Sequence, residues 1–358
     1  MPDLPNMLHV LPDLAGRAWH AFSMLLAGWP VRTTLQIALA ALVIERILGW
    51  PQFMQDLTGH PVEWIGGMIE RFERRYNRWR TFPPFLLKLL GAAMVLGLVA
   101  FWGILAWMVH RALFQLLTPQ WGCLAEALLA SVFLAQSSLR DHVRAVCMAL
   151  ERHGGDLDPA RREVSRIVGR HTAELDETGV VKAAVESLAE NTSDGIVAPA
   201  FWLALFGLPG IVVYKVVNTC DSMVGYRSER FRHFGWLTAR LDDVMNFVPA
   251  RLTGLMLAMA AGLTSPSAGA RALHVMWRDA RKHVSPNAGW PEAAVAGALD
   301  ISLGGPRSYP GLVVDLPWMG DGRKRLTPED IRRALSLYGQ MLTLMLVIGF
   351  FFWLFMPD

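Results

Sequence analysis

Charged residues are scarce in this chain of 358 residues, since Asp, Glu, Lys and Arg make up only 18% of it. Soluble domains usually carry about 25% charged residues. Hydrophobic residues make up 53% of the chain, and its mean hydropathy is +0.30. This composition argues against a soluble protein and is typical of a multi-pass membrane protein.

Cysteine is also rare, and the standard nucleotide-binding motifs are missing. The three cysteines, Cys123, Cys147 and Cys220, are scattered and form no CxxC pair, so we expect neither a disulfide scaffold nor a zinc site. Cys220 lies among polar residues without an evident His partner, which favours a packing role over a nucleophile. The chain has no GxxxxGK[ST] and no GxGxxG string. Any nucleotide would therefore occupy a non-standard site.

The net charge is only +3, and basic residues flank the apolar runs. This distribution predicts contact with membrane lipid and no nucleic-acid partner. The first 30 residues contain acids and prolines before the first apolar run, so they do not resemble a cleaved signal peptide.

Apolar runs predict an all-α, multi-pass integral membrane protein that forms a single membrane domain. A crossing needs about 20 residues, and the candidate spans are 33–49, 85–109, 121–139, 196–217, 247–263 and 337–356. Gly207, Pro209 and Gly210 interrupt the fourth run. We therefore favour a broken, re-entrant pair of half-helices there over a full crossing.

Arginine-rich segments predict the orientation of the chain. Five arginines separate the first two spans: Arg71, Arg74, Arg75, Arg78 and Arg80. The positive-inside rule places this segment in the cytoplasm. The segment 140–190 is again rich in arginine and is predicted to be a cytoplasmic helical insert. The side of the membrane that loop 264–336 occupies stays open.

The first polar cluster lies at the end of that insert. If 180–194 is helical, Glu186, Glu190 and Asp194 recur every four residues on one face. Three like charges on one face repel one another, so a cation is expected. Magnesium favours a few carboxylates together with phosphate oxygens. The alternative is a solvated face of a cytoplasmic helix.

Two further polar clusters follow at helical spacing. Lys215 is suited to neutralising a phosphate, and Asp221 to binding metal or acting as a base. Asp242 and Asn246 share a helix face, and Arg251 is suited to clamping a carboxylate or phosphate. The alternatives are an internal Lys–Asp pair in the second cluster and a structural salt-bridge network in the third.

The fourth cluster is the loop 283–292, which Pro286 and Pro291 make rigid. Ser285 and Asn287 are candidate donors to an anion, although ordinary turn chemistry also explains the prolines and glycine. We predict Lys215, Asp221 and Asp243 as catalytic residues. The predicted magnesium ligands are Glu186, Glu190, Asp194 and Asp242. The predicted substrate- and nucleotide-binding residues are His60, Asn191, Asn218, Ser222, Arg240, Asn246, Arg251, His283, Ser285, Asn287 and Glu292.

These segments resemble adenosylcobinamide-phosphate synthase, the CobD/CbiB family of cobalamin biosynthesis. The matching strings occur in the family's order and are specific only in combination. They are HPVEWIG (60–66), IVGRHT (167–172), VESLAENTSDGIVAP (185–199), YKVVNTCDSMVGY (214–226), ARLDDVMNFVPARLT (239–253), SPNAGWPEAAVAGAL (285–299) and LGGP (303–306).

The resemblance implies an enzyme of the bacterial inner membrane whose active site faces the cytoplasm. Its expected reaction joins a carboxylate of the corrinoid adenosylcobyric acid, or cobyric acid, to aminopropanol or aminopropanol phosphate. ATP and Mg²⁺ are the expected cofactors, with phosphorylation of the carboxylate before amine attack. Other membrane-bound enzymes of cobalamin assembly are expected partners.

The chain departs from the family pattern at two places. Trp50 lies where the family usually has an acidic string after the first span, and His171 replaces an acid in the VGRD-T string. Glu45 or Asp56 is a candidate substitute for the first acid, and Glu174 or Asp176 for the second. These departures keep two alternatives open: a non-catalytic or regulatory membrane paralogue resembling the AmpE group, and a transporter.

Overall fold

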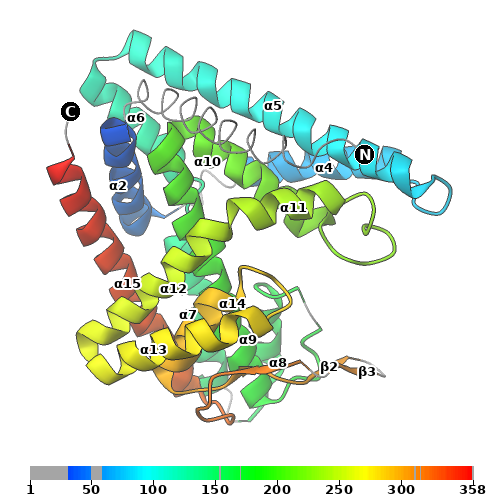
Figure 1. Ribbon diagram of the computed structural model, residues 1–358, viewed down its shortest axis with the longest axis vertical. Coiled ribbons are helices and arrows are strands. Elements are labelled where there is room, and N and C mark those ends of the chain that lie inside the picture. The colour runs from blue at the N-terminus through cyan, green and yellow to red at the C-terminus, as the bar shows by residue number, and fades with distance from the viewer. Residues whose placement is uncertain are drawn as a thin grey trace, which may run out of the picture.

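The structure is a computed structural model that describes residues 31–49, 59–152, 155–169, 171–309, 312–314 and 316–356. Helices dominate these residues, and the few strands are two or three residues long (Figure 1). The predicted all-α class is therefore confirmed. Trp50 and Asp56 lie outside the described residues.

The helices follow one another closely along the chain. They are α2 (Val31–Leu48), α4 (Pro61–Tyr76), α5 (Pro84–Leu116), α6 (Pro119–Ser131), α7 (Gln136–Arg152), α8 (Asp158–Ser165), α9 (Glu177–Thr192), the π-helix η1 (Ser193–Val197), α10 (Ala198–Val224), α11 (Trp236–Met245), α12 (Phe247–Thr264), α13 (Pro266–Asp279), the 3-10 helix η2 (Ala280–Lys282), α14 (Gly289–Leu299) and α15 (Pro328–Phe355). Two antiparallel strand pairs complete the fold: β1 (Leu303–Gly304) with β4 (Trp318–Met319), and β2 (Arg307–Tyr309) with β3 (Leu312–Val314).

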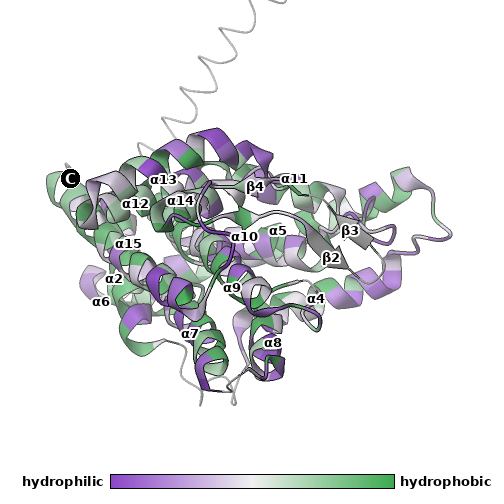
Figure 2. Cartoon of the chain, turned by 90° about the horizontal axis from the view of Figure 1, so that it is seen from below, coloured by the Kyte–Doolittle hydropathy of each residue, from purple (hydrophilic) through white to green (hydrophobic). Residues whose placement is uncertain are grey.

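Five helical stretches of the described chain are long and apolar enough to cross a membrane: 84–116, 119–152, 177–224, 247–264 and 328–355. Five of the predicted spans overlap these stretches, and the sixth, 33–49, corresponds to α2. Large apolar side chains such as Phe101, Trp107 and Phe351 are exposed on the outer helices, as expected for surfaces that face lipid. Hydrophobic residues dominate α2, α12 and α15, whereas hydrophilic residues gather around α7 and α8 (Figure 2).

The break predicted within 196–217 is present in α10. Phe206 leaves the helical conformation, and Gly207 has φ 61° and ψ −154°, a region that is open almost only to glycine. The amide of Leu208 is freed at this break, and it donates to Glu126 Oε1 of α6 at 2.7 Å. Glu126 also pairs with His110 Nδ1 at 2.7 Å. A buried carboxylate from a neighbouring helix thus satisfies the broken backbone.

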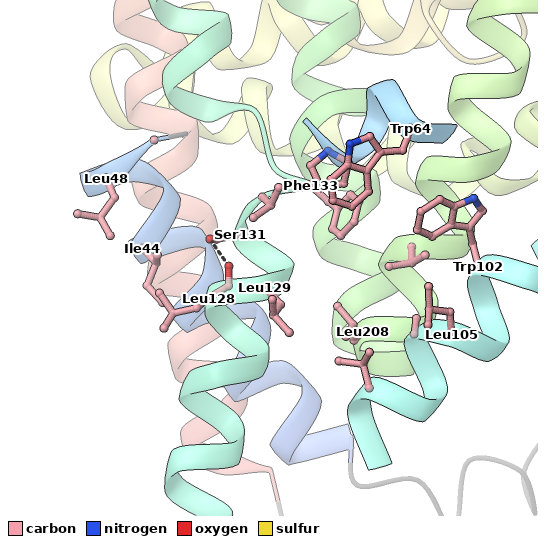
Figure 3. Close-up of a pocket in the computed structure, with 16 residues that line it drawn as sticks. Ile44, Leu48, Trp64, Trp102, Leu105, Leu128, Leu129, Ser131, Phe133 and Leu208 are labelled. Atoms are coloured by element: carbon pink, nitrogen blue, oxygen red, sulfur yellow. Dashed lines mark hydrogen bonds between the residues drawn. The ribbon is translucent and has the colours of Figure 1, made fainter. Parts of the chain in front are cut away.

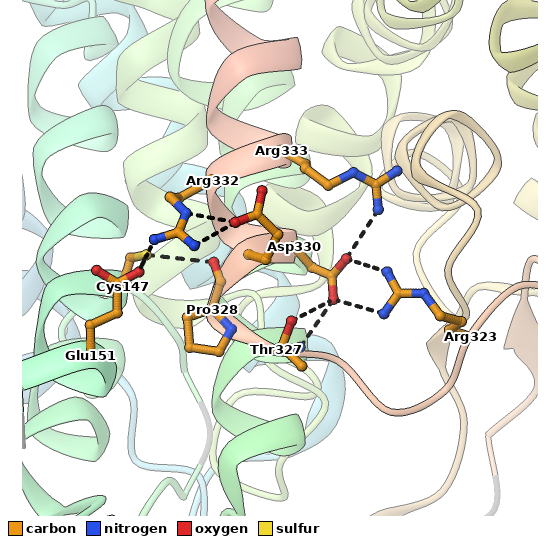
Figure 4. Close-up of polar contacts among 9 residues, drawn as sticks. Cys147, Glu151, Arg323, Thr327, Pro328, Asp330, Arg332 and Arg333 are labelled. Atoms are coloured by element: carbon orange, nitrogen blue, oxygen red, sulfur yellow. Dashed lines mark hydrogen bonds and ion pairs between the residues drawn. The ribbon is translucent and has the colours of Figure 1, made fainter. Parts of the chain in front are cut away.

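A second buried carboxylate, that of Asp330, holds the start of α15 against the preceding loop (Figure 4). Asp330 has 0% of its surface exposed and accepts hydrogen bonds from Arg323 Nη2 at 2.7 Å and from Thr327 N at 3.0 Å. Arg333 Nη1 lies 3.2 Å from the same carboxylate. Nearby, Arg332 pairs with Glu151 of α7. These contacts tie α15 both to the preceding loop and to α7.

We expect Asp330→Ala to lower the free energy of unfolding by roughly 3 kcal/mol, because it leaves partly buried arginines and a helix cap without their carboxylate. Thermal unfolding of the detergent-solubilised protein measures the loss. Glu329→Ala is the matched control, since Glu329 pairs with Arg332 at the exposed surface, where ion pairs contribute little. Equal losses in the two variants would contradict a special role for the buried carboxylate.

Candidate functional site

Three of the polar segments converge where α10 packs against η1 and α11. Tyr214, which is fully buried, donates to the Asp194 carbonyl oxygen at 3.0 Å and to Asn246 Oδ1 at 2.9 Å. Asn246 Nδ2 then donates to Asp242 Oδ2 at 3.0 Å. This chain of hydrogen bonds joins segments that are far apart in sequence and fixes the position of the Asp242 carboxylate.

Asp242 is held by a second amide from α10, because Asn218 Nδ2 donates to its Oδ1 at 3.3 Å. Burial raises the pKa of Asp242 to about 6, and the neighbouring charge of Asp243 acts in the same direction. The hydrogen bonds from Asn246 and Asn218 and the charge of Lys215 lower this pKa in part. Asp242 therefore changes its charge close to neutral pH.

Carboxylates from four elements, α9, η1, α10 and α11, form one electrostatically linked set. We call this set the acidic cluster: Glu190, Asp194, Asp221, Asp242 and Asp243. Within the described part of the chain, the Asp221 carboxylate accepts no hydrogen bond and forms no ion pair, although the charges of Asp242, Asp243 and Glu190 all act on it. Such uncompensated like charge favours a cationic ligand.

Lys215 brings a positive charge to the acidic cluster. It interacts electrostatically with Asp194 and Asp242, yet its ammonium makes no hydrogen bond or ion pair with any residue that the structure describes. A lysine held near acids without direct contact is available to a further anion, such as a phosphate.

The acidic cluster is not a ready-made metal site. In the described ranges, no three His, Cys, Asp or Glu side chains come together as metal ligands do. Magnesium, however, usually takes one or two protein carboxylates and completes its shell with waters and substrate phosphates. The residues present therefore fit a magnesium–phosphate complex better than a bare ion.

Not every predicted magnesium ligand belongs to this cluster. Glu186 is 5% exposed, and its Oε1 accepts from the amide of Gly304 at 2.8 Å, so it holds the LGGP turn. Asn191 Nδ2 donates to the Ser187 carbonyl oxygen at 2.9 Å, and Ser222 donates to that of Asn218 at 2.9 Å. Asn191 and Ser222 thus bond within their own helices, whereas Glu186 makes a long-range contact with the turn at Gly304.

The loop 283–292 is docked onto the α11–α12 junction through Asn287. Its Nδ2 donates to the Asp243 carbonyl oxygen at 2.8 Å, and its Oδ1 accepts from Arg251 Nη1 at 3.1 Å. The Arg251 guanidinium lies between two aromatic rings, 3.6 Å from the centroid of Phe247 and 4.5 Å from that of Trp290. The loop and Arg251 of α12 thereby lie beside Asp243 at the edge of the acidic cluster.

The remaining residues of this loop mainly shape it. His283 Nδ1 accepts from the amide of Ser285 at 3.0 Å, and His283 Nε2 lies 3.6 Å from Glu292 Oε1. Ser285 Oγ accepts from the amides of Asn287 and Ala288, each at 3.2 Å. At the other side, Arg240 pairs with the Asp243 carboxylate at 3.5 Å.

His60 is the N-cap residue of α4. Its Nδ1 accepts from the amide of Val62 at 3.2 Å, which caps the helix. Burial lowers the pKa of His60, and the positive charge of Lys215 lowers it further. His60 therefore lies within electrostatic reach of Lys215.

Beside His60, an apolar cavity of about 600 Å³ opens between α2, α5, α6 and α10 (Figure 3). Pro61, Trp64 and Trp102 line it together with leucines such as Leu128 and Leu208, and no charged side chain of the described residues does so. Such a lining does not suit phosphates. The polar chemistry is thus assigned to the acidic cluster and not to this apolar cavity.

The two departures from the family pattern have different outcomes. His171 is exposed, and Trp50 lies outside the described residues. Two of the candidate substitutes are engaged elsewhere: Asp176 accepts from the amide of Gly179 at 2.8 Å, and Glu45 accepts from that of Ser137 at 2.9 Å. Neither carboxylate is directed to the acidic cluster by these contacts.

Sequence reasoning missed Tyr214. Its spacing of four residues from Asn218 was the available signal, because a helix places both on one face. A tyrosine in an apolar helix is more often a packing residue, and only the contact with Asn246 distinguishes it.

Comparison with known proteins gives the family. The profile described as CobD/Cbib protein matches residues 38–338. A protein of Rhodobacter capsulatus named cobalamin biosynthesis protein CobD is 48% identical over 312 residues, which cover 86% of this chain and 94% of the relative. Proteins with the same name from Sinorhizobium sp. and Brucella suis are 47% and 46% identical, over 87% and 85% of this chain and 96% and 92% of their own lengths. No solved structure matches the chain. The chain belongs to the CobD/Cbib protein family.

Proposed function

We propose that this protein is an ATP-dependent amide ligase of cobalamin biosynthesis. It would join a carboxylate of adenosylcobyric acid or cobyric acid to aminopropanol or aminopropanol phosphate. The names of its relatives support the biosynthetic role. The reaction type rests on the resemblance and on the chemistry of the residues around the acidic cluster.

The observation that carries the proposal is Lys215, a lysine without a direct partner in the described structure, within electrostatic reach of Asp194 and Asp242 of the acidic cluster. In the proposed reaction, an oxygen of the corrinoid carboxylate attacks the γ-phosphorus of ATP and ADP leaves. The amine then attacks the acyl carbon and inorganic phosphate leaves. Both steps move phosphate charge, and a positioned lysine stabilises that charge.

The other residues have complementary roles in this proposal. Asp221 and Asp242, with Glu190, would hold Mg²⁺, which supplies neutralising charge at the phosphate oxygens. Asp243 lies at the rim, is paired with Arg240, and is suited to accepting the proton that the amine loses. Arg251 is suited to holding an anionic group of a substrate, because its guanidinium is fixed between two rings.

The deciding experiment is an assay of the full-length protein in detergent with adenosylcobyric acid, aminopropanol phosphate, ATP and Mg²⁺. Mass spectrometry should detect the amide product together with ADP, and omission of ATP should abolish it. Corrinoid binding without product would favour the non-catalytic paralogue. The replacement of a family acid by His171, which is exposed, supports that alternative. Corrinoid uptake into proteoliposomes without ATP consumption would favour the transporter.

The pKa of Asp242 predicts an acid limb in the pH profile. If the ionised carboxylate is required, kcat/KM should fall as the pH drops through about 6, because Asp242 becomes protonated there. Activity should be measured between pH 5 and 8, with thermal unfolding at each pH to exclude loss of the fold. A flat profile over this range in folded protein would contradict a role for ionised Asp242.

A further inference from the structure

A groove separate from the acidic cluster runs between the α12–α13 turn and α15. It consists of two adjoining hollows of about 680 and 320 Å³, which share the side chains of Thr264, Ser336 and Gln340. Thr264 Oγ1 donates to Gln340 Oε1 at 3.1 Å and so links the two walls. The neighbouring helices α12, α13 and α15 lie together in Figure 1. The groove therefore has walls from packed helices and a polar floor.

Positive charge lines this groove. Arg46 lies in one hollow, and Arg271 and Arg333 lie in the other, whereas no acidic side chain lines either hollow in the described part of the chain. Arg333 is engaged with Asp330 and with the Leu299 carbonyl oxygen. Arg46 donates to Thr343 Oγ1 at 3.2 Å, and neither Arg46 nor Arg271 has a carboxylate partner among the described residues. Two guanidinium groups are thus available to an anion.

Apolar side chains line part of the larger hollow. Ala260, Leu263, Leu344 and Val347 line the larger hollow, and Leu263 and Val347 are 75% and 46% exposed. These residues belong to α12 and α15, both of which are long and apolar enough to cross a membrane. The groove thus combines an arginine-lined polar end with an apolar wall along two membrane helices.

We propose that this groove binds an anionic phospholipid, with the headgroup phosphate between Arg46 and Arg271 and an acyl chain along α12 and α15. Basic pockets between membrane helices recognise anionic headgroups in this way. Free phosphate would satisfy the arginines but would leave the apolar wall unused, and a zwitterionic lipid would bring a cation to the arginines. The lipid would brace α15 against α12, independently of the proposed ligase reaction.

The test uses the full-length, delipidated protein in detergent and native mass spectrometry. Dioleoylphosphatidylglycerol and dioleoylphosphatidylcholine are added separately, and bound lipid is counted as a function of lipid concentration. The wild type should bind the anionic lipid preferentially. The double variant Arg46→Gln/Arg271→Gln should bind it about tenfold to thirtyfold more weakly. The control Arg144→Gln/Arg152→Gln removes two exposed arginines from α7 and should leave binding unchanged.

Several outcomes would overturn the proposal. They are equal binding of the two lipids by the wild type, an unchanged preference in the double variant, an equal loss in the control, or displacement of the lipid by inorganic phosphate at the same concentration. Thermal unfolding is a second measurement, which distinguishes lost lipid binding from a folding defect in the double variant. Phosphatidylglycerol should raise the thermal unfolding temperature of the wild type and of the control more than that of the double variant. A uniform rise in all three proteins would also overturn the proposal.

Discussion

Asp221→Asn is expected to lower the rate of amide formation by at least about 100-fold while leaving the protein inserted and folded. The carboxylate makes no hydrogen bond with the described residues and is repelled by Asp242, Asp243 and Glu190. The isosteric amide therefore removes charge without removing a structural contact. Initial rates by mass spectrometry, together with thermal unfolding of the same preparation, measure the two effects.

A matched control for this prediction is Asp141→Asn. Asp141 is 61% exposed and pairs only with its neighbour Arg140 among the described residues, so both rate and stability should stay unchanged. Full activity of Asp221→Asn would remove Asp221 from the reaction. A variant that failed to insert or unfolded early would instead assign it a structural role.

Lys215→Met is expected to lower the same rate by a similar factor, roughly 100-fold, because it removes the charge that would stabilise phosphate during transfer. The methionine side chain is nearly as long as that of lysine and fills a similar space. Lys215→Arg should restore part of the activity, since it keeps the charge but alters the geometry. Binding of ATP to each variant, measured by equilibrium titration with Mg²⁺, separates a binding defect from a rate defect.

The control here is Lys88→Met, which removes an exposed lysine that lies over the Trp236 ring. It should leave the rate unchanged. If Lys215→Met kept its activity, the lysine would be a counter-charge for Asp194 and Asp242 and not a phosphate ligand. In that case its stability should fall, because the acidic cluster would lose its nearby positive charge.

The helical elements of this protein follow from local sequence. Apolar runs of about 20 residues predict the membrane helices, and Pro61, Pro84 and Pro328 start helices at the first turn, where a missing amide hydrogen costs nothing. Gly207 and Pro209 predict the break in α10 for the same local reasons. The resemblance to the family rests on strings of residues and is confirmed by the comparisons.

The composition of the acidic cluster required the tertiary structure. The period of four that grouped Glu186 with Asp194 ignores the axial rise of about 1.5 Å per residue, which separates them by roughly 12 Å. One ion cannot contact both, and Glu186 instead binds the Gly304 amide. The period of four did place Glu190 near Asp194, but Lys215 of α10 and Asp242 of α11, which also act on Asp194, come from helices that no local pattern places beside it.

The sequence by itself determined the fold class, the apolar runs that form the long helices, the break in α10 and the family, because each depends on neighbours along the chain or on strings of residues. Only the tertiary structure decided which polar side chains meet. It brought Tyr214 to the Asp242–Asn246 pair, which helical spacing had already placed on one face, and it used Asn287 to dock a loop. It also left Lys215 without a direct partner in the described chain. The physical reason is that a buried polar group is satisfied by whichever partner helix packing brings within about 3 Å, and that packing is a property of the whole chain.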